Sequence, residues 1–170
     1  MFTKTDIEKY FLAEKSESLL FMLIGIAAIV AAIIFYFIIK TNWCKGACIP
    51  FLIVGIIHTI IGFIVFNRSD SDRIKNVYAY DMNISELKQR ELPRMEIVNR
   101  NFMIYRYTEI ILFAAGLILF FLFKTDKQFW AGFGIALAIE ALISLSADYF
   151  AEKRAIIYSE GLKEYVDKLP

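Results

Sequence analysis

Residues 19–39, with the sequence LLFMLIGIAAIVAAIIFYFII, form a run of 21 residues without a charged side chain. A helix of this length extends about 31 Å, which is enough to cross the hydrocarbon core of a bilayer. The run is too long for the hydrophobic region of a secretory signal peptide, and no small-residue cleavage site follows it before the next apolar run. We therefore expect this segment to stay in the protein as a membrane-spanning helix.

Three further apolar runs follow, at residues 47–66, 104–123 and 129–150. Helices are the expected conformation, because backbone amide and carbonyl groups cannot be left unpaired in lipid and a barrel strand would show about ten alternating residues. The sequence thus predicts an all-α integral membrane protein with four transmembrane helices. We expect these helices to form two hairpins in a single domain that covers residues 1–170.

Composition supports this class of protein. Hydrophobic residues make up 58% of the chain and aromatic residues 16%, and the hydrophobic share is above that of average globular proteins. Such a content argues against a disordered chain and against an ordinary soluble enzyme, and two cysteines are too few for a disulfide scaffold. The net charge of +1 does not favour a nucleic acid as partner.

The distribution of basic residues predicts the orientation of the chain. Of the 19 lysines and arginines, 14 lie in residues 1–18, 67–103 and 151–170. Arg106, at the adjoining end of the third span, brings the number on this side to 15. By the positive-inside rule, this side is the cytoplasm. We therefore expect a multi-pass protein of the cell membrane, the inner membrane in a bacterium, with both termini and a helical layer in the cytoplasm.

Glu140 is the one acidic residue expected near the centre of the bilayer. Its position in the fourth span places it about 16 Å from the outer end of that span. Ionisable groups at this depth are functional candidates, because an acid there costs roughly 2.5–3.5 kcal/mol on insertion scales. Small and polar residues share its helical face at steps of four, which is typical of a helix-packing stripe. The other residues of the stripe are Gly132, Ala136, Ser144 and Asp148.

His58 lies as far into the second span as Glu140 lies into the fourth, and both spans cross the bilayer in the same direction. The spacing therefore predicts His58 and Glu140 at the same depth, where they could form a hydrogen-bonded pair. Such a pair can relay protons or bind a cation or an amine. It can equally be a polar clasp between two helices, with a contribution of about 1 kcal/mol.

Two further groups of residues have both a structural and a functional interpretation. Arg106 and Glu109 are three residues apart at the inner end of the third span, so they can pair on one helix face. The structural interpretation is an arginine that reaches the membrane surface with its counter-ion, and the functional one is an inner gate. Cys44 and Cys48 flank the first outer turn, where a disulfide is plausible in an oxidising compartment. Their spacing is not that of a thiol oxidoreductase.

Residues 91–109 alternate charged with apolar side chains before the third span. An interfacial aromatic belt with solvated charges explains this pattern. The alternative is a partner-docking surface, because arginine and tyrosine are enriched at binding hot spots. The candidates for such a surface are Arg94, Glu96, Arg100 and Tyr105.

The chain lacks the phosphate-binding, zinc-hydrolase and serine-hydrolase motifs, and it has one histidine. We therefore expect a non-enzymatic protein without cofactor or metal, embedded in the lipid bilayer, that acts through contacts with a protein partner or with further copies of itself. An accessory subunit and an immunity-type protein both fit this class. The alternative is a small oligomeric transporter or channel for protons or cations that uses Glu140 with His58.

Overall fold

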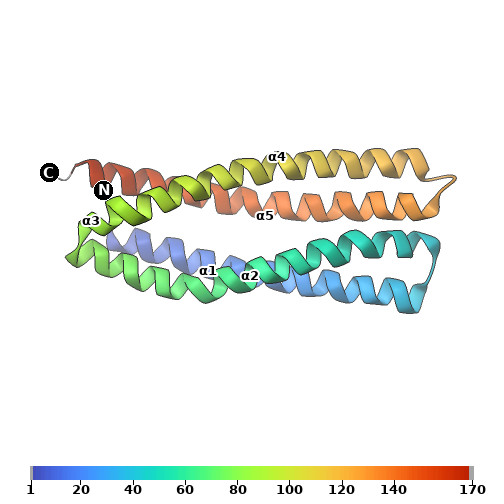
Figure 1. Ribbon diagram of the computed structural model, residues 1–170, viewed down its shortest axis with the longest axis horizontal. Coiled ribbons are helices and arrows are strands. Elements are labelled where there is room, and N and C mark those ends of the chain that lie inside the picture. The colour runs from blue at the N-terminus through green and yellow to red at the C-terminus, as the bar shows by residue number, and fades with distance from the viewer. Residues whose placement is uncertain (1, 169–170) are drawn as a thin grey trace.

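The computed structural model describes residues 2–168 and is all-helical over that range. Figure 1 shows the long helices side by side, with the start of α1, the end of α5 and the short α3 at one end of the molecule. In chain order the elements are α1 Lys4–Ile34, a π-helical turn Phe35–Ile39, α2 Asn42–Met82, α3 Ile84–Glu86, a second π-helical turn Leu87–Glu91, α4 Leu92–Phe123 and α5 Gln128–Asp167.

By length and composition, four helical segments are long and apolar enough to cross a membrane. Each is far longer than the roughly 20 residues that a crossing needs, since α2 has 41 residues and α5 has 40. At 1.5 Å per residue α2 extends about 61 Å, about twice the thickness of the hydrocarbon core. Each long helix therefore combines an apolar segment with a more polar extension.

The first turn between helices is shorter than the sequence suggested. Lys40 adopts a left-handed backbone conformation, with φ at 59°, and this ends the π-helical turn. The Thr41 side chain then accepts a hydrogen bond from the amide of Cys44 at 3.2 Å, which caps α2. Residues 42–46, expected in an outer loop, are therefore the first turns of α2.

Close approaches of glycine hold the apolar segments together. A Cβ atom on Gly25 of α1 would lie 2.6 Å from the carbonyl oxygen of Gly55 on α2. A Cβ atom on Gly116 of α4 would likewise lie 2.6 Å from the carbonyl oxygen of Gly134 on α5. At these points the helix backbones touch, which only a residue without a side chain permits.

The four helices do not surround a common apolar core along their whole length. α1 and α2 cross, so that α2 lies between α1 and α5 in the apolar half, whereas α1 contacts α5 near the chain ends, and α4 packs mainly against α5 (Figure 1). Large apolar side chains on the outer faces of α1 and α4 are therefore uncovered. They include Leu20, Leu23 and Val30 on α1, and Ile111, Ile118 and Leu122 on α4. Uncovered aliphatic side chains on apolar helices are the expected surface for lipid contact.

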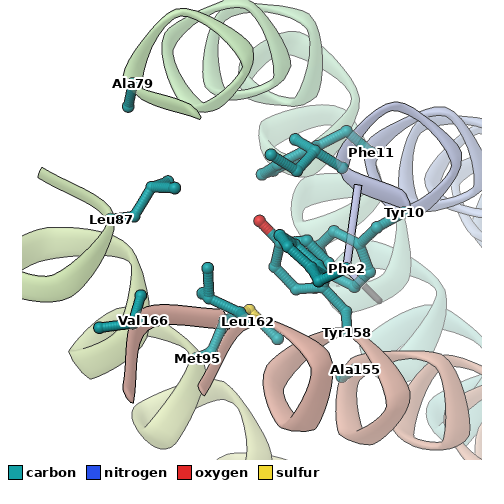
Figure 2. Close-up of a cluster of buried hydrophobic side chains, with 11 residues drawn as sticks. Phe2, Tyr10, Phe11, Ala79, Leu87, Met95, Ala155, Tyr158, Leu162 and Val166 are labelled. Carbon is teal, nitrogen blue, oxygen red and sulfur yellow. The ribbon is translucent and has the colours of Figure 1, made fainter. Parts of the chain in front are cut away.

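The polar extensions of the helices enclose a separate hydrophobic core (Figure 2). Its centre is aromatic, because the rings of Tyr10 on α1 and Tyr158 on α5 stack with centroids 4.2 Å apart. The ring of Phe2 packs against Tyr158 at 5.7 Å. The remaining members are Ile7, Phe11, Ala79, Leu87, Met95, Ala155, Leu162 and Val166. All the long helices contribute to this core, so the extensions form a packed layer rather than loose ends.

Candidate functional site

His58 and Glu140 are both buried between helices in the apolar part of the molecule. Glu140 of α5 is 1% exposed, and its Oε2 atom has no hydrogen-bond partner among residues 2–168. His58 of α2 is also buried, with its ring 4.1 Å from the ring of Phe21. Its Nε2 atom lies 2.9 Å from Ser144 Oγ, and its Nδ1 atom has no hydrogen-bond partner in the described part of the chain. The structure thus joins His58 to Ser144, and the direct hydrogen bond to Glu140 that the sequence suggested is not formed.

The true helix starts explain this difference. His58 lies as far along the chain from Asn42, where α2 begins, as Ser144 lies from Gln128, where α5 begins. Glu140 is one turn, or about 6 Å, nearer the start of its helix. The sequence-based prediction measured depth from the start of each apolar run. Because α2 begins well before its apolar run, the prediction placed His58 one turn too near the start of its helix.

The hydrogen bonds of Ser144 indicate which ring nitrogen of His58 carries the proton. The Ser144 hydroxyl donates its single proton to the carbonyl oxygen of Glu140 at 3.0 Å. It must then accept from His58, so Nε2 is the protonated nitrogen and Nδ1 is a bare acceptor. The result is a short series of hydrogen bonds, from the imidazole of His58 to the hydroxyl of Ser144 and on to the backbone carbonyl of Glu140. The carboxyl group of Glu140 lies on the same helix, one turn away.

The small-residue stripe on α5 contacts two different helices. Gly132 lies against the backbone of Trp43 on α2, and Ala136 and Ser144 are buried. Asp148, at the inner end of the stripe, lies against Glu109 of α4 instead. A step of four residues is slightly more than one full helical turn, so such a stripe winds around the helix and leaves one neighbour for another.

The predicted pair of Arg106 and Glu109 is not formed, because each residue has a partner on α5. Arg106 Nη1 lies 3.2 Å from Glu152 Oε2. The Glu109 carboxyl lies against that of Asp148, and its Oε2 atom accepts no hydrogen bond from any of residues 2–168. Sequence reasoning missed Glu152, which it assigned to the cytosolic tail. The four-residue spacing of Asp148 and Glu152, one turn apart on α5, is the signal that could have identified it.

Cys44 and Cys48 are free thiols, so the disulfide considered from the sequence is not present. Both residues lie in the first turns of α2, and the thiol of Cys48 is 3.0 Å from the carbonyl oxygen of Lys45. They occupy consecutive turns of one helix rather than the two ends of a flexible loop. Within residues 2–168, no group of three or more histidine, cysteine or acidic side chains is arranged to hold a metal ion.

Of the four docking candidates, Arg94 points into the molecule and the other three are exposed. Arg94 Nε and Nη2 donate to the two oxygens of Glu91 at 2.8 and 2.7 Å, and its guanidinium lies over the ring of Phe11. Glu91 is 1% exposed and also accepts from the Tyr158 hydroxyl at 3.1 Å. Burial, together with the nearby Glu91 carboxylate, raises the pKa of Tyr158, which therefore remains a hydrogen-bond donor at neutral pH.

A row of strongly exposed apolar side chains lies elsewhere in the polar layer, on α2. Ile74, Tyr78 and Met82 are 63, 64 and 73% exposed, and steps of four residues place them along one face of the helix. The opposite face, with Asn76 and Ala79, is buried in the molecule. We call these three residues the α2 stripe. Sequence reasoning overlooked it, although its four-residue spacing was readable.

Comparison of the chain with protein-family models, with curated proteins and with solved structures found no match.

Proposed function

We propose that the protein is inserted in the inner membrane of a bacterium by the four apolar helical segments, as two hairpins. The polar layer around Tyr10 and Tyr158 then lies in the cytoplasm with both chain ends. Two observations support this arrangement: the uncovered aliphatic faces of α1 and α4, and the basic residues concentrated at the end that carries the polar layer.

The function we propose is that of a non-enzymatic accessory subunit, which acts by contact with another protein. The observation that carries this proposal is the α2 stripe. In the proposed topology it lies outside the bilayer, so lipid does not cover it. Three large apolar side chains in a row on a water-facing helix are costly to leave uncovered and are typical of an interaction site.

The partner we propose is a helix of another integral membrane protein, which runs beside α2. The α2 stripe continues the lipid-facing surface of the same helix, where Ile60 and Ile64 are also exposed. A partner helix that lies beside Ile60 and Ile64 within the membrane would remain in contact with Ile74 and Met82 after it leaves the bilayer. The spacing of the stripe, at every fourth residue, suits packing against such a helix.

Photo-cross-linking in native membranes tests this proposal. A benzophenone side chain at Tyr78 should give one discrete product, which mass spectrometry identifies as an integral membrane protein. Ile74→Asp should abolish that product, whereas Lys88→Asp, at an exposed position off the stripe, should leave it unchanged. The same benzophenone side chain placed at Glu96 on α4 is the control for position. The proposal fails if Tyr78 yields no protein product, or if Glu96 captures the same product equally well. A product made of two copies of this chain would replace the partner by a homo-oligomer.

A second candidate function is proton- or cation-coupled transport, which the unpartnered atoms of Glu140 and His58 favour. A carboxyl and a bare imidazole nitrogen in the apolar segment are the groups that a proton relay uses. In vesicles, Glu140→Gln should then abolish a pH-driven flux, and Ser144→Ala should reduce it. If flux across vesicles containing the wild-type chain does not exceed that of empty vesicles, transport is excluded.

A further inference from the structure

A cavity of about 430 Å³ lies between α4 and α5 at the inner end of the apolar segments. This volume is in the range of small-molecule sites in proteins. Much of its wall is apolar, from Ile110 on α4 and from Leu145 and Phe150 on α5. In the proposed topology the cavity opens at the boundary between the hydrocarbon core and the lipid headgroups.

The polar part of the same wall carries both signs of charge. Arg106 Nη1 donates to Glu152, and the guanidinium lies 5.8 Å from the centre of the Tyr107 ring. Its other guanidinium nitrogens have no hydrogen-bond partner among residues 2–168. Asp148 also lines the cavity, and the carboxyl of Glu109 lies against it. Glu109 is 9% exposed and its Oε2 atom is unpartnered. Two carboxyl groups in contact need a cation or a proton between them, because two negative charges side by side in a buried place repel each other strongly.

These features define the chemistry of a ligand. The donors of Arg106 suit a phosphate, because guanidinium groups bind phosphate oxygens with two parallel hydrogen bonds. The Asp148 and Glu109 carboxyls suit an ammonium group that donates hydrogen bonds. The apolar wall suits an acyl chain. A ligand with all three parts is a phospholipid whose headgroup carries a primary amine.

We propose that this cavity binds a zwitterionic aminophospholipid of the phosphatidylethanolamine type. Arg106 holds the phosphate, Asp148 with Glu109 holds the ammonium, and Ile110 and Leu145 line the path of an acyl chain. The inference rests on the membrane insertion proposed above, and it is independent of the partner at the α2 stripe.

The test measures which lipid the full chain retains. The chain is reconstituted in vesicles of equal phosphatidylethanolamine, phosphatidylcholine and phosphatidylglycerol with matched acyl chains, then extracted in mild detergent, and the bound lipid is quantified by mass spectrometry. Phosphatidylethanolamine should be enriched about tenfold over both other lipids, which corresponds to one hydrogen bond to a charged group. Phosphatidylcholine is the informative competitor, because its quaternary ammonium cannot donate a hydrogen bond.

Asp148→Asn should reduce the enrichment towards the vesicle composition. Arg106→Gln should lower the total amount of lipid retained, because all three lipids carry the phosphate that Arg106 binds. The matched controls Asp126→Asn, in the outer turn, and Arg100→Gln, exposed on α4, should leave both the enrichment and the retained amount unchanged. Ile110→Trp is a second type of variant, which fills the cavity without altering its charge and should lower retention of all three lipids.

Three results would overturn the proposal. The first is retention in the proportions of the vesicle, and the second is a full enrichment that survives in Asp148→Asn together with a full amount of retained lipid in Arg106→Gln. The third is displacement of the lipid by equimolar glycerophosphoethanolamine, which would assign the site to a soluble amine phosphate instead. Flotation of the vesicles separates these outcomes from failure of membrane insertion, because a chain that does not float with the vesicles refutes the topology as well.

Discussion

Replacing Glu91 by glutamine should destabilise the polar layer more than any other isosteric change at a charged residue there. The carboxylate accepts two hydrogen bonds from Arg94, at 2.8 and 2.7 Å, and one from Tyr158. Glutamine keeps the shape but removes the charge, so Arg94 retains a partly buried cation without a counter-ion. Hydrogen bonds to charged groups contribute about 1.5–3 kcal/mol and neutral ones about 0.5–1.5 kcal/mol. Because the glutamine amide has one acceptor oxygen, one of the two bonds from Arg94 is lost and the other becomes neutral, which together gives about 3 kcal/mol.

The assay is thermal unfolding of the full chain in detergent, followed by circular dichroism in the far ultraviolet. For a chain of this size, about 3 kcal/mol corresponds to a decrease in Tm of about 6–12 °C. Adding Arg94→Met to Glu91→Gln should restore most of the loss, because removal of both charges leaves no unpaired ion at this position.

Glu86 provides the matched control. It pairs with Arg90 at 3.5 Å, near the same connection between α2 and α4, but both side chains are nearly half exposed. Glu86→Gln should change the free energy of unfolding by less than about 0.5 kcal/mol, because water screens an exposed pair. The explanation is refuted if the decrease in Tm for Glu91→Gln is no larger than that for Glu86→Gln, or if the double variant is less stable than Glu91→Gln alone.

Three further predictions concern other parts of the molecule. Gly134→Leu should lower Tm strongly, whereas Gly134→Ala should lower it less, because any Cβ there would lie 2.6 Å from the carbonyl oxygen of Gly116. Equal melting temperatures for both variants and the wild type would contradict the close backbone contact. Phe2→Ala should cost about 3 kcal/mol in chemical unfolding, since it removes the buried ring packed against the aromatic core, and an unchanged midpoint would show that the ring does not contribute. Burial raises the pKa of Glu14, which pairs with Arg68, so the folded state binds this proton more tightly than the unfolded state. The contribution of Glu14 to stability should therefore decrease as pH rises from about 4.5, its pKa in the unfolded chain, through its raised pKa in the folded state. Glu14→Gln should flatten the dependence of stability on pH over this range.

The apolar runs predicted the class of fold well, because few conformations other than a helix suit about twenty uncharged, apolar residues in a row. They predicted helix ends poorly, since α2 begins before its apolar run, with a cap at Thr41, and continues far beyond it. This error had a direct consequence for the site. A shift of one helical turn moved His58 from the level of Glu140 to that of Ser144.

Pairings between charged residues were the least predictable feature. Arg106 and Glu109 suit each other along the chain, yet each contacts α5, because α5 presents Glu152 and Asp148 one turn apart. Arg94 resembled a surface residue, and only the packed arrangement of the helices shows that its partner Glu91 is buried. Helical spacing identifies which residues share a face, but which neighbour covers that face depends on tertiary packing.

The unbroken path of α2 from the apolar segment into the polar layer has a mechanical consequence. From Gly55, where it touches α1, to Met82, α2 continues without an interruption over about 40 Å. A rigid rod of that length is a lever, and a tilt of about 5° at the glycine contact displaces the far end by about 3.5 Å. Small rotations of the apolar segment would thus be amplified at the α2 stripe, where a bound protein could detect them.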